Sequence, residues 1–138
     1  MNRREFVTDI LDDSQQADVL GTIVRFLASK GVESVRAAFG FVFERDLRGE
    51  NQGQDAVVAL AELQQFIQQG LTEGTIEWSG TSDFRLFPVG LDLDLMLCND
   101  SDLHFYSTNP ALLMELSRMI SDLGVKVYES GKLVSADD

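Results

Sequence analysis

The sequence changes its apolar period about halfway along the chain, and this change constrains the fold more than any other feature. Within Leu91–Cys98, every odd-numbered residue is leucine, and Asp92 and Asp94 stand between leucines. This period of two is typical of a half-buried strand. Before residue 70, apolar residues instead recur every three or four positions, as they do along one side of a helix. We therefore expect an α+β fold, with a mainly helical half (residues 1–70) preceding a mainly sheet half (71–138).

About four helices are expected in the first half. They are predicted over Arg3–Leu11, Gln15–Lys30, Val32–Arg48 and Asp55–Gln69. Lys30 followed by Gly31 is a typical helix end, and Gly70 would end the fourth helix. A strand stays open for Val32–Arg48, because Phe39, Phe41 and Phe43 also alternate. A loop is predicted at Gly49–Gly53.

Five to six short strands and one late helix are expected in the second half. The predicted strands are Thr75–Ser79, Phe84–Phe87, Leu91–Cys98, Leu103–Ser107, Val125–Tyr128 and Lys132–Val134, and the first two would form a hairpin. Asn109 followed by Pro110 is typical of a helix start, and this helix would run to Leu123. It would cross over between two strands, which permits them to run parallel within a mainly antiparallel sheet that packs one face on the helices.

Length and composition predict a single domain over residues 1–138 and a cytoplasmic location. A chain of 138 residues is within the usual size of one domain. Cys98 is the only cysteine in the sequence, so no internal disulfide can form and nothing indicates an oxidising compartment. Acidic residues follow Arg3 and Arg4 at once, which is unlike a secretory signal. No stretch has the ~20 apolar residues that span a bilayer.

The charge of the chain bears on its partners. Lys and Arg number 11 and Asp and Glu 23, which gives a net charge of −12. Residues 71–138 hold four of the basic and twelve of the acidic residues, a net charge of −8. Such a field repels nucleic acids and anionic membranes, and it attracts basic proteins. We therefore expect a protein partner, with a basic partner as one option and self-association left open.

Four aspartates and the single histidine form the candidate site. They are Asp92, Asp94, Asp100, Asp102 and His104. Clustered carboxylates suit a weak Mg²⁺ or Ca²⁺ site, although the spacing of a calcium loop is missing, and they equally suit the solvated side of a strand and a turn. We interpret this group as an interaction face or weak metal face.

No residue is assigned to catalysis, cofactor binding or firm metal binding, and no cofactor is expected. His104 beside a carboxylate suits a general base, and Cys98 near His104 suits a nucleophile pair, but the spacing of known catalytic motifs is absent. One cysteine and one histidine are few ligands for a zinc site. Phosphate-binding glycine loops are absent as well.

The first functional hypothesis is a non-enzymatic interaction module, of the inhibitor or antidote type, that binds its partner through the acidic sheet half. The alternative is a small-ligand or effector-binding domain with a pocket between sheet and helices. Its lining would include Phe39, Phe43, Phe66 and Trp78. A third hypothesis is a hydrolase that uses the region of Asp92, Asp94 and His104.

Overall fold

Eight strands form one continuous sheet in the computed structural model, which describes residues 2–38, 55–74, 76, 78, 84–98 and 100–134. The elements follow in the order β1 (Arg4–Thr8), α1 (Asp13–Ser29), β2 (Ser34–Ala38), β3 (Asp55–Ala59), α2 (Leu60–Glu73), β4 (Phe84–Pro88), β5 (Asp94–Leu97), β6 (Leu103–Ser107), α3 (Pro110–Ser121), β7 (Val127–Glu129) and β8 (Lys132–Leu133). Across the sheet the order is β3-β2-β4-β5-β6-β1-β7-β8. Each pair of neighbouring strands in the described chain is antiparallel.

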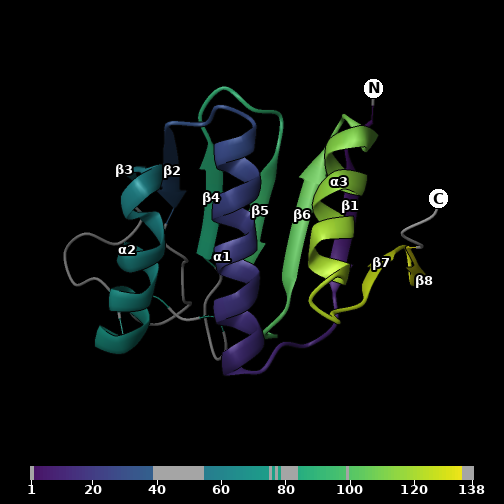
Figure 1. Cartoon of the computed structure of the whole chain (residues 1–138), viewed down its shortest axis with the longest axis horizontal. Coiled ribbons are helices and arrows are strands. Elements are labelled where there is room, and N and C mark those ends of the chain that lie inside the picture. The colour runs from purple at the N-terminus through teal and green to yellow at the C-terminus, as the bar shows by residue number, and fades with distance from the viewer. Residues whose placement is uncertain are drawn as a thin grey trace.

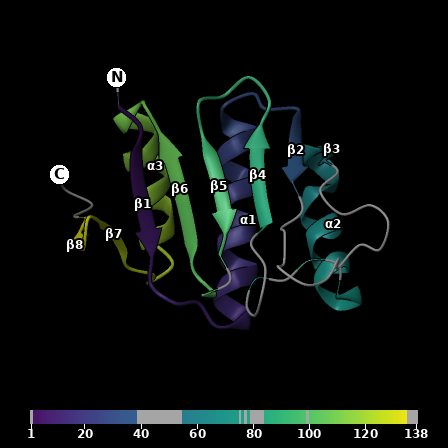
Figure 2. The same cartoon turned by 180° about the vertical axis from the view of Figure 1, so that it is seen from behind.

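The three described helices cover one face of the sheet, and none of them lies on the other face (Figures 1 and 2). The core lies between the two layers. Its large side chains include Phe6 and Phe105 from the sheet, whose rings meet edge to face at 5.6 Å, and Phe26 from α1. Antiparallel sheets tolerate one solvated face because their side chains alternate between core and surface. The predicted α+β class and mainly antiparallel sheet are therefore confirmed. The predicted numbers of elements, about four helices and five to six strands, are wrong, because the described chain has three helices and eight strands.

The segment predicted as the first helix, Arg3–Leu11, forms strand β1 instead. Phe6 and Thr8 are buried, as alternation in a strand requires. Ile10, which the helical interpretation placed on the apolar side, is 73% exposed. The apolar residues of a segment this short match the period of a helix and that of a strand by chance. Pairing with β6 and β7 on its two sides stabilises the strand.

Within the described part of Val32–Arg48, residues 34–38 form strand β2, so the alternative left open for this segment is the one that forms and the helix is wrong there. Val35 and Ala37 are buried and Arg36 between them is exposed. This strand lies between β3 and β4, so the fold overrides the helix propensity of the alanines. Residues 39–48 and the predicted loop Gly49–Gly53 lie outside the described residues.

The predicted helix Asp55–Gln69 is a strand followed by a helix, β3 and α2. Ala59 precedes the helix without a capping side chain, and the N–H of Leu60 donates instead to the carbonyl of Glu33 at 2.9 Å. Gly70, the predicted end, is buried inside the helix. Gly74 ends it with φ of +82°, a conformation that glycine adopts without strain.

The predicted hairpin of Thr75–Ser79 with Phe84–Phe87 does not form in the described residues. Ile76 and Trp78 are buried but belong to no strand, and the rest of Thr75–Ser79 is outside the described residues. Strand β4 pairs with β2 and β5.

The remaining elements lie where they were predicted, with bounds that agree to within a few residues. Helix α1 begins with a capping box in which the Asp12 carboxylate accepts from Gln15 N–H. At the start of α3, Asn109 Oδ1 accepts from Ala111 N–H at 3.0 Å. Because β1 pairs antiparallel with both β6 and β7, the crossover through α3 connects two parallel strands that have β1 between them. Among the described helices, none combines the length and apolarity needed to cross a membrane.

Candidate functional site

The uncovered face of the sheet is built from alternate residues of its strands. Register places Arg36 of β2 beside Phe87 of β4, and Met96 of β5 beside His104 of β6. Tyr106 lies between Asp94 and Glu5 in the same way. Apolar, aromatic and charged side chains therefore alternate across this face. We call these seven residues, with Arg3 and Arg85, the open face.

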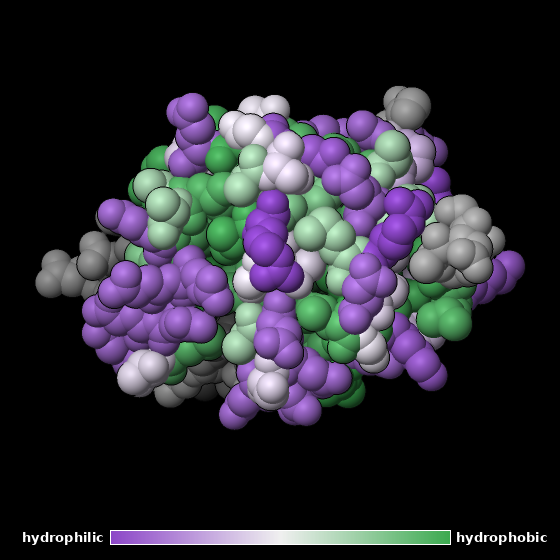
Figure 3. All heavy atoms as spheres, in the orientation of Figure 1, coloured by the Kyte–Doolittle hydropathy of each residue, from purple (hydrophilic) through white to green (hydrophobic). Residues whose placement is uncertain are grey.

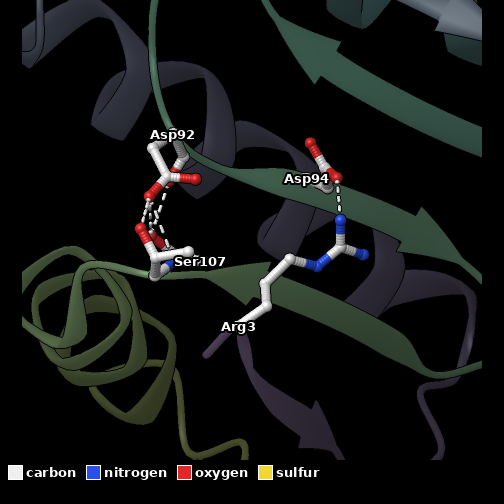
Figure 4. A network of polar contacts seen from close by, with 5 residues as sticks. Arg3, Asp92, Asp94 and Ser107 are labelled. Atoms are coloured by element: carbon white, nitrogen blue, oxygen red, sulfur yellow. Dashed lines mark hydrogen bonds and ion pairs between the residues drawn. The ribbon is translucent and has the colours of Figure 1, made fainter. Parts of the chain in front are cut away.

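The carboxylate of Asp94 on the open face is paired with an arginine, Arg3. Arg3 Nη1 donates to Asp94 Oδ2 at 2.8 Å (Figure 4), and its guanidinium lies 4.7 Å from the ring centre of Tyr106. The guanidinium of Arg36 lies 4.3 Å from the ring centre of Phe87. Ion and ring contacts of this kind fix the arginines over aromatic surface. The open face is therefore mixed in charge rather than acidic.

The four predicted aspartates do not converge. Asp94 faces Tyr106 at one end of the β5–β6 pair, whereas Asp102 belongs to the turn at the other end, where Leu97 faces Leu103. Asp100, in the same turn, is exposed. The four aspartates thus lie at two separate places, and Asp102 is the one of the four that lies beside His104.

Asp92 precedes β5, and its carboxylate accepts hydrogen bonds from the two residues that lead into α3. Its carboxylate accepts from the backbone N–H of Thr108 at 3.1 Å, from the Thr108 hydroxyl, and from Ser107 Oγ at 3.3 Å (Figure 4). The hydrogen bonds from Thr108 hold the pKa of Asp92 below its ordinary value, since they favour the charged form. This aspartate has a structural role at the junction of strand and helix.

Cys98, Asp102 and His104 form a compact cluster at the other end of the pair. One potential ligand atom from each residue lies within 4.8 Å of the other two. Cys98 is buried, and the side chains of Asp102 and His104 are only 14% and 18% exposed. The alternation of side chains along the strands explains the cluster. Cys98, Asp102 and His104 are each next to Leu97 or Leu103, whose side chains face inward, so alternation places the three on the other side.

Backbone contacts fix the turn that carries the cluster. Cys98 N–H donates to the carbonyl of Asp102 at 3.0 Å, and the indole N–H of Trp78 donates to the same carbonyl at 2.8 Å. The N–H of Leu11 donates to the carbonyl of Ser101 at 2.9 Å. Ser101 adopts φ of +70°, a conformation that non-glycine residues visit mainly in turns. Segments distant in sequence thus hold Cys98 and Asp102 together.

His104 lies between two carboxylates. Its Nδ1 is 2.6 Å from Glu5 Oε2, and its Nε2 is 3.0 Å from Asp102 Oδ1. Burial raises the pKa of Glu5, but hydrogen bonds from His104 and Tyr106 outweigh it and leave that pKa below its ordinary value. The sequence placed Asp102 and His104 in the site but missed Glu5, because only the pairing of β1 with β6 brings Glu5 there.

A cavity of about 470 Å³ opens between α1 and α2 on the helix side. Asp13 and Gln16 line it from α1, Gln68 and Thr72 from α2, and Trp78 from the chain beyond. Of the four aromatic residues predicted to line a pocket, only Trp78 does so among the described residues. Phe66 packs against the core, and Phe39 and Phe43 lie outside the described residues.

Comparisons of the chain with protein-family models, with curated proteins and with solved structures find no match.

Proposed function

We propose that this chain is a non-enzymatic protein-interaction module whose partner docks on the open face. The observation that carries the proposal is an eight-stranded sheet that the described helices cover on one side only (Figure 2). Register places aromatic and arginine side chains on its other side. An inhibitor or antidote in the cytoplasm is the class of protein that we favour.

The composition of the open face supports a protein partner. Protein interfaces are enriched in Tyr, Phe, Met and Arg and depleted in Lys. Strands β2, β4, β5 and β6 present Arg36, Arg85, Phe87, Met96 and Tyr106 on this face, and these four strands contain no lysine. By contrast, the helix side has hydrophilic and hydrophobic residues interspersed over all three helices (Figure 3).

Charge defines what the partner would look like. The net charge of −12 attracts a basic protein over the distance of a Debye length, ~8 Å at physiological salt. At contact, however, the partner meets a face on which Arg3 already pairs with Asp94. We therefore expect a partner of basic net charge whose docking surface has an apolar centre and charged groups of both signs.

Site-specific cross-linking tests this proposal. A photoreactive phenylalanine analogue replaces Phe87 on the open face, and a matched variant carries it at Gln65, an exposed position on α2. We expect a heterologous protein to be cross-linked from position 87 and not from position 65, and the added substitution Tyr106→Glu to abolish that product. Cross-links confined to position 65, or a product that Tyr106→Glu leaves unchanged, would contradict docking on the open face. A product between two copies of the chain would assign the face to self-association.

The cavity between α1 and α2 favours a second function, the binding of a small ligand. Its volume of about 470 Å³ is within the range of small-molecule sites, and Trp78 supplies an aromatic wall. Native mass spectrometry of the purified protein would test this, because a bound metabolite adds mass that Thr72→Trp, which fills the cavity, should remove.

A further inference from the structure

We propose that Cys98, Asp102 and His104 bind a divalent transition-metal ion, and that Zn²⁺ is the ion that this set fits best. The inference is independent of the proposed docking on the open face. It also goes against the expectation from sequence that one cysteine and one histidine are too few for such a site.

Three ligand atoms of suitable chemistry already converge. The Cys98 sulfur, an Asp102 oxygen and a His104 nitrogen lie within 4.8 Å of one another. Zinc bonds of ~2.0–2.3 Å in a tetrahedron hold ligand atoms ~3.3–3.8 Å apart. His104 Nε2 and Asp102 Oδ1 are already 3.0 Å apart. The Cys98 sulfur is therefore the atom that has to approach, by up to about 1 Å, a movement within reach of a χ rotation at Cys98.

Asp102 Oδ1 is the atom that most directly favours a bound cation. It is buried, and within the part of the chain that the structure describes it has no hydrogen-bond partner. His104 Nε2 approaches it to 3.0 Å without the alignment of a hydrogen bond. A buried carboxylate oxygen left in this state costs free energy, and a cation bound between it and the imidazole would remove that cost.

Glu5 supplies the outer contact that metal-binding histidines usually have. Such a histidine commonly donates its second ring N–H to a carboxylate, which fixes the ring orientation. Here Glu5 Oε2 is 2.6 Å from Nδ1 of His104, so Nε2 is the nitrogen left to face Asp102 and Cys98. The hydroxyl of Tyr106 hydrogen-bonds Glu5 in turn. The orientation of the ring is therefore set before any ion arrives.

The fold also holds the other two ligands in place. Cys98 and Asp102 are joined across their turn by the hydrogen bond from Cys98 N–H, and Trp78 anchors the same carbonyl. A thiolate, an imidazole and one carboxylate form a set preferred by zinc over Mg²⁺ and Ca²⁺, which take oxygen ligands. Three protein ligands leave a fourth position for water or for a group from outside the chain.

Cobalt and zinc titrations of the chelator-treated full chain test the proposal. We expect one Zn²⁺ per chain with an apparent Kd on the order of 1 µM or tighter, unaffected by ~1 mM Mg²⁺ or Ca²⁺. Co²⁺ in the same site should give the near-ultraviolet absorption of a cobalt–thiolate bond. Glu5→Gln should weaken zinc binding by ~10–100-fold, as loss of an outer partner does, and Cys98→Ser by more.

Asp100→Asn is the matched control, because Asp100 is an exposed carboxylate of the same turn. It should bind Zn²⁺ as the unaltered chain does. Absence of stoichiometric uptake, cobalt spectra without a thiolate band, or equal affinities for Cys98→Ser and the unaltered chain would each overturn the proposal. If Cys98→Ser fails to fold, the cobalt spectrum of the unaltered chain still decides whether the sulfur binds the ion.

Discussion

Gly70 shows how a single residue can be fixed by a neighbour that the local sequence does not reveal. It lies in the last turn of α2, where glycine is normally less favourable than alanine by ~1 kcal/mol. A Cβ atom built on Gly70 would lie 2.3 Å from Cδ1 and 2.6 Å from Cγ1 of Ile76. Ile76 is itself buried, so its side chain has little room to move away.

Gly70→Ala should therefore destabilise the protein, against the helix propensity scale. We expect the free energy of unfolding to fall by about 1–3 kcal/mol, the usual cost of overpacking. Gly21→Ala is the control, because the nearest atoms to its added Cβ are side-chain atoms at 3.6 and 3.7 Å. That change should stabilise by about 0.5–1 kcal/mol. Urea denaturation of both variants checks the pair, and stabilisation by both would show that Ile76 does not press on Gly70.

Residues of the candidate site could be predicted only where sequence neighbours carry them. Asp102, at the end of the turn, and His104, in β6, are two positions apart, so period two places their side chains on one side. Cys98 joins them once the turn between β5 and β6 is recognised. Glu5 is 99 positions from His104, and the strand that carries it was predicted as helix. The contact between Glu5 and His104 therefore depends on the order of the strands, which no local sequence pattern reveals.

At the scale of elements, helices α1 and α3 were predicted well, whereas the segments that form β1 and β2 were predicted as helices. Helices α1 and α3 have both a periodic apolar side and a capping residue, Asp12 or Asn109. Strands β1 and β2 have only five residues each, and their apolar spacing also suits a helix. In such segments the partner strands decide the conformation, and these partners lie far along the chain.

The junction between β5 and α3 yields a prediction on pH. The pKa of Asp92 is lowered in the folded state by its bonds to Thr108, so the charged carboxylate stabilises the fold above its ordinary pKa of about 3.9. That stabilisation is lost as the pH falls through the lower folded-state value. Asp92 is exposed, so solvent screens its charge. Asp92→Asn should then cost only about 0.5–1 kcal/mol at pH 7, since a bond to a charged acceptor becomes a bond to a neutral one. The cost should shrink below about pH 4.

Urea denaturation at pH 7 and pH 3 measures this difference. Asp18→Asn is the control, because Asp18 is exposed on α1 and its loss should change stability by less than about 0.5 kcal/mol at either pH. A cost of Asp92→Asn that is the same at both pH values would mean that the charge of Asp92 does not strengthen the junction.

At the scale of the whole molecule, the sheet separates two surfaces. The described helices cover one face and complete the core, and the open face, with Arg3 beside Asp94, is the one on which we propose that a partner docks. The cluster of Cys98, Asp102 and His104 lies at the end of the β5–β6 pair, and His104 belongs to the open face as well, so a metal ion there would lie at the docking surface. The two proposals rest on different observations and can fail separately, although a bound partner could supply the fourth ligand.

The net charge of the molecule leads to a final prediction, on salt. Even if each of the 11 basic residues paired with an acidic one, 12 carboxylates would remain unpaired and repel one another. Ion pairs such as Arg4–Glu129, at 2.6 Å, and Lys30–Glu115, at 2.8 Å, are partly exposed and are each worth about 0–1 kcal/mol. Salt weakens these pairs, but it also screens the larger excess of like charge.

Raising NaCl from ~0.01 to ~0.15 M, which shortens the Debye length from ~30 to ~8 Å, should raise Tm by a few degrees. Asp18→Lys with Glu62→Lys, both at exposed helix positions, changes the net charge from −12 to −8 and should flatten this dependence. Calorimetry at several salt concentrations measures both slopes, and a Tm that falls with salt would show that local ion pairs, rather than the net charge, dominate the electrostatics of the fold.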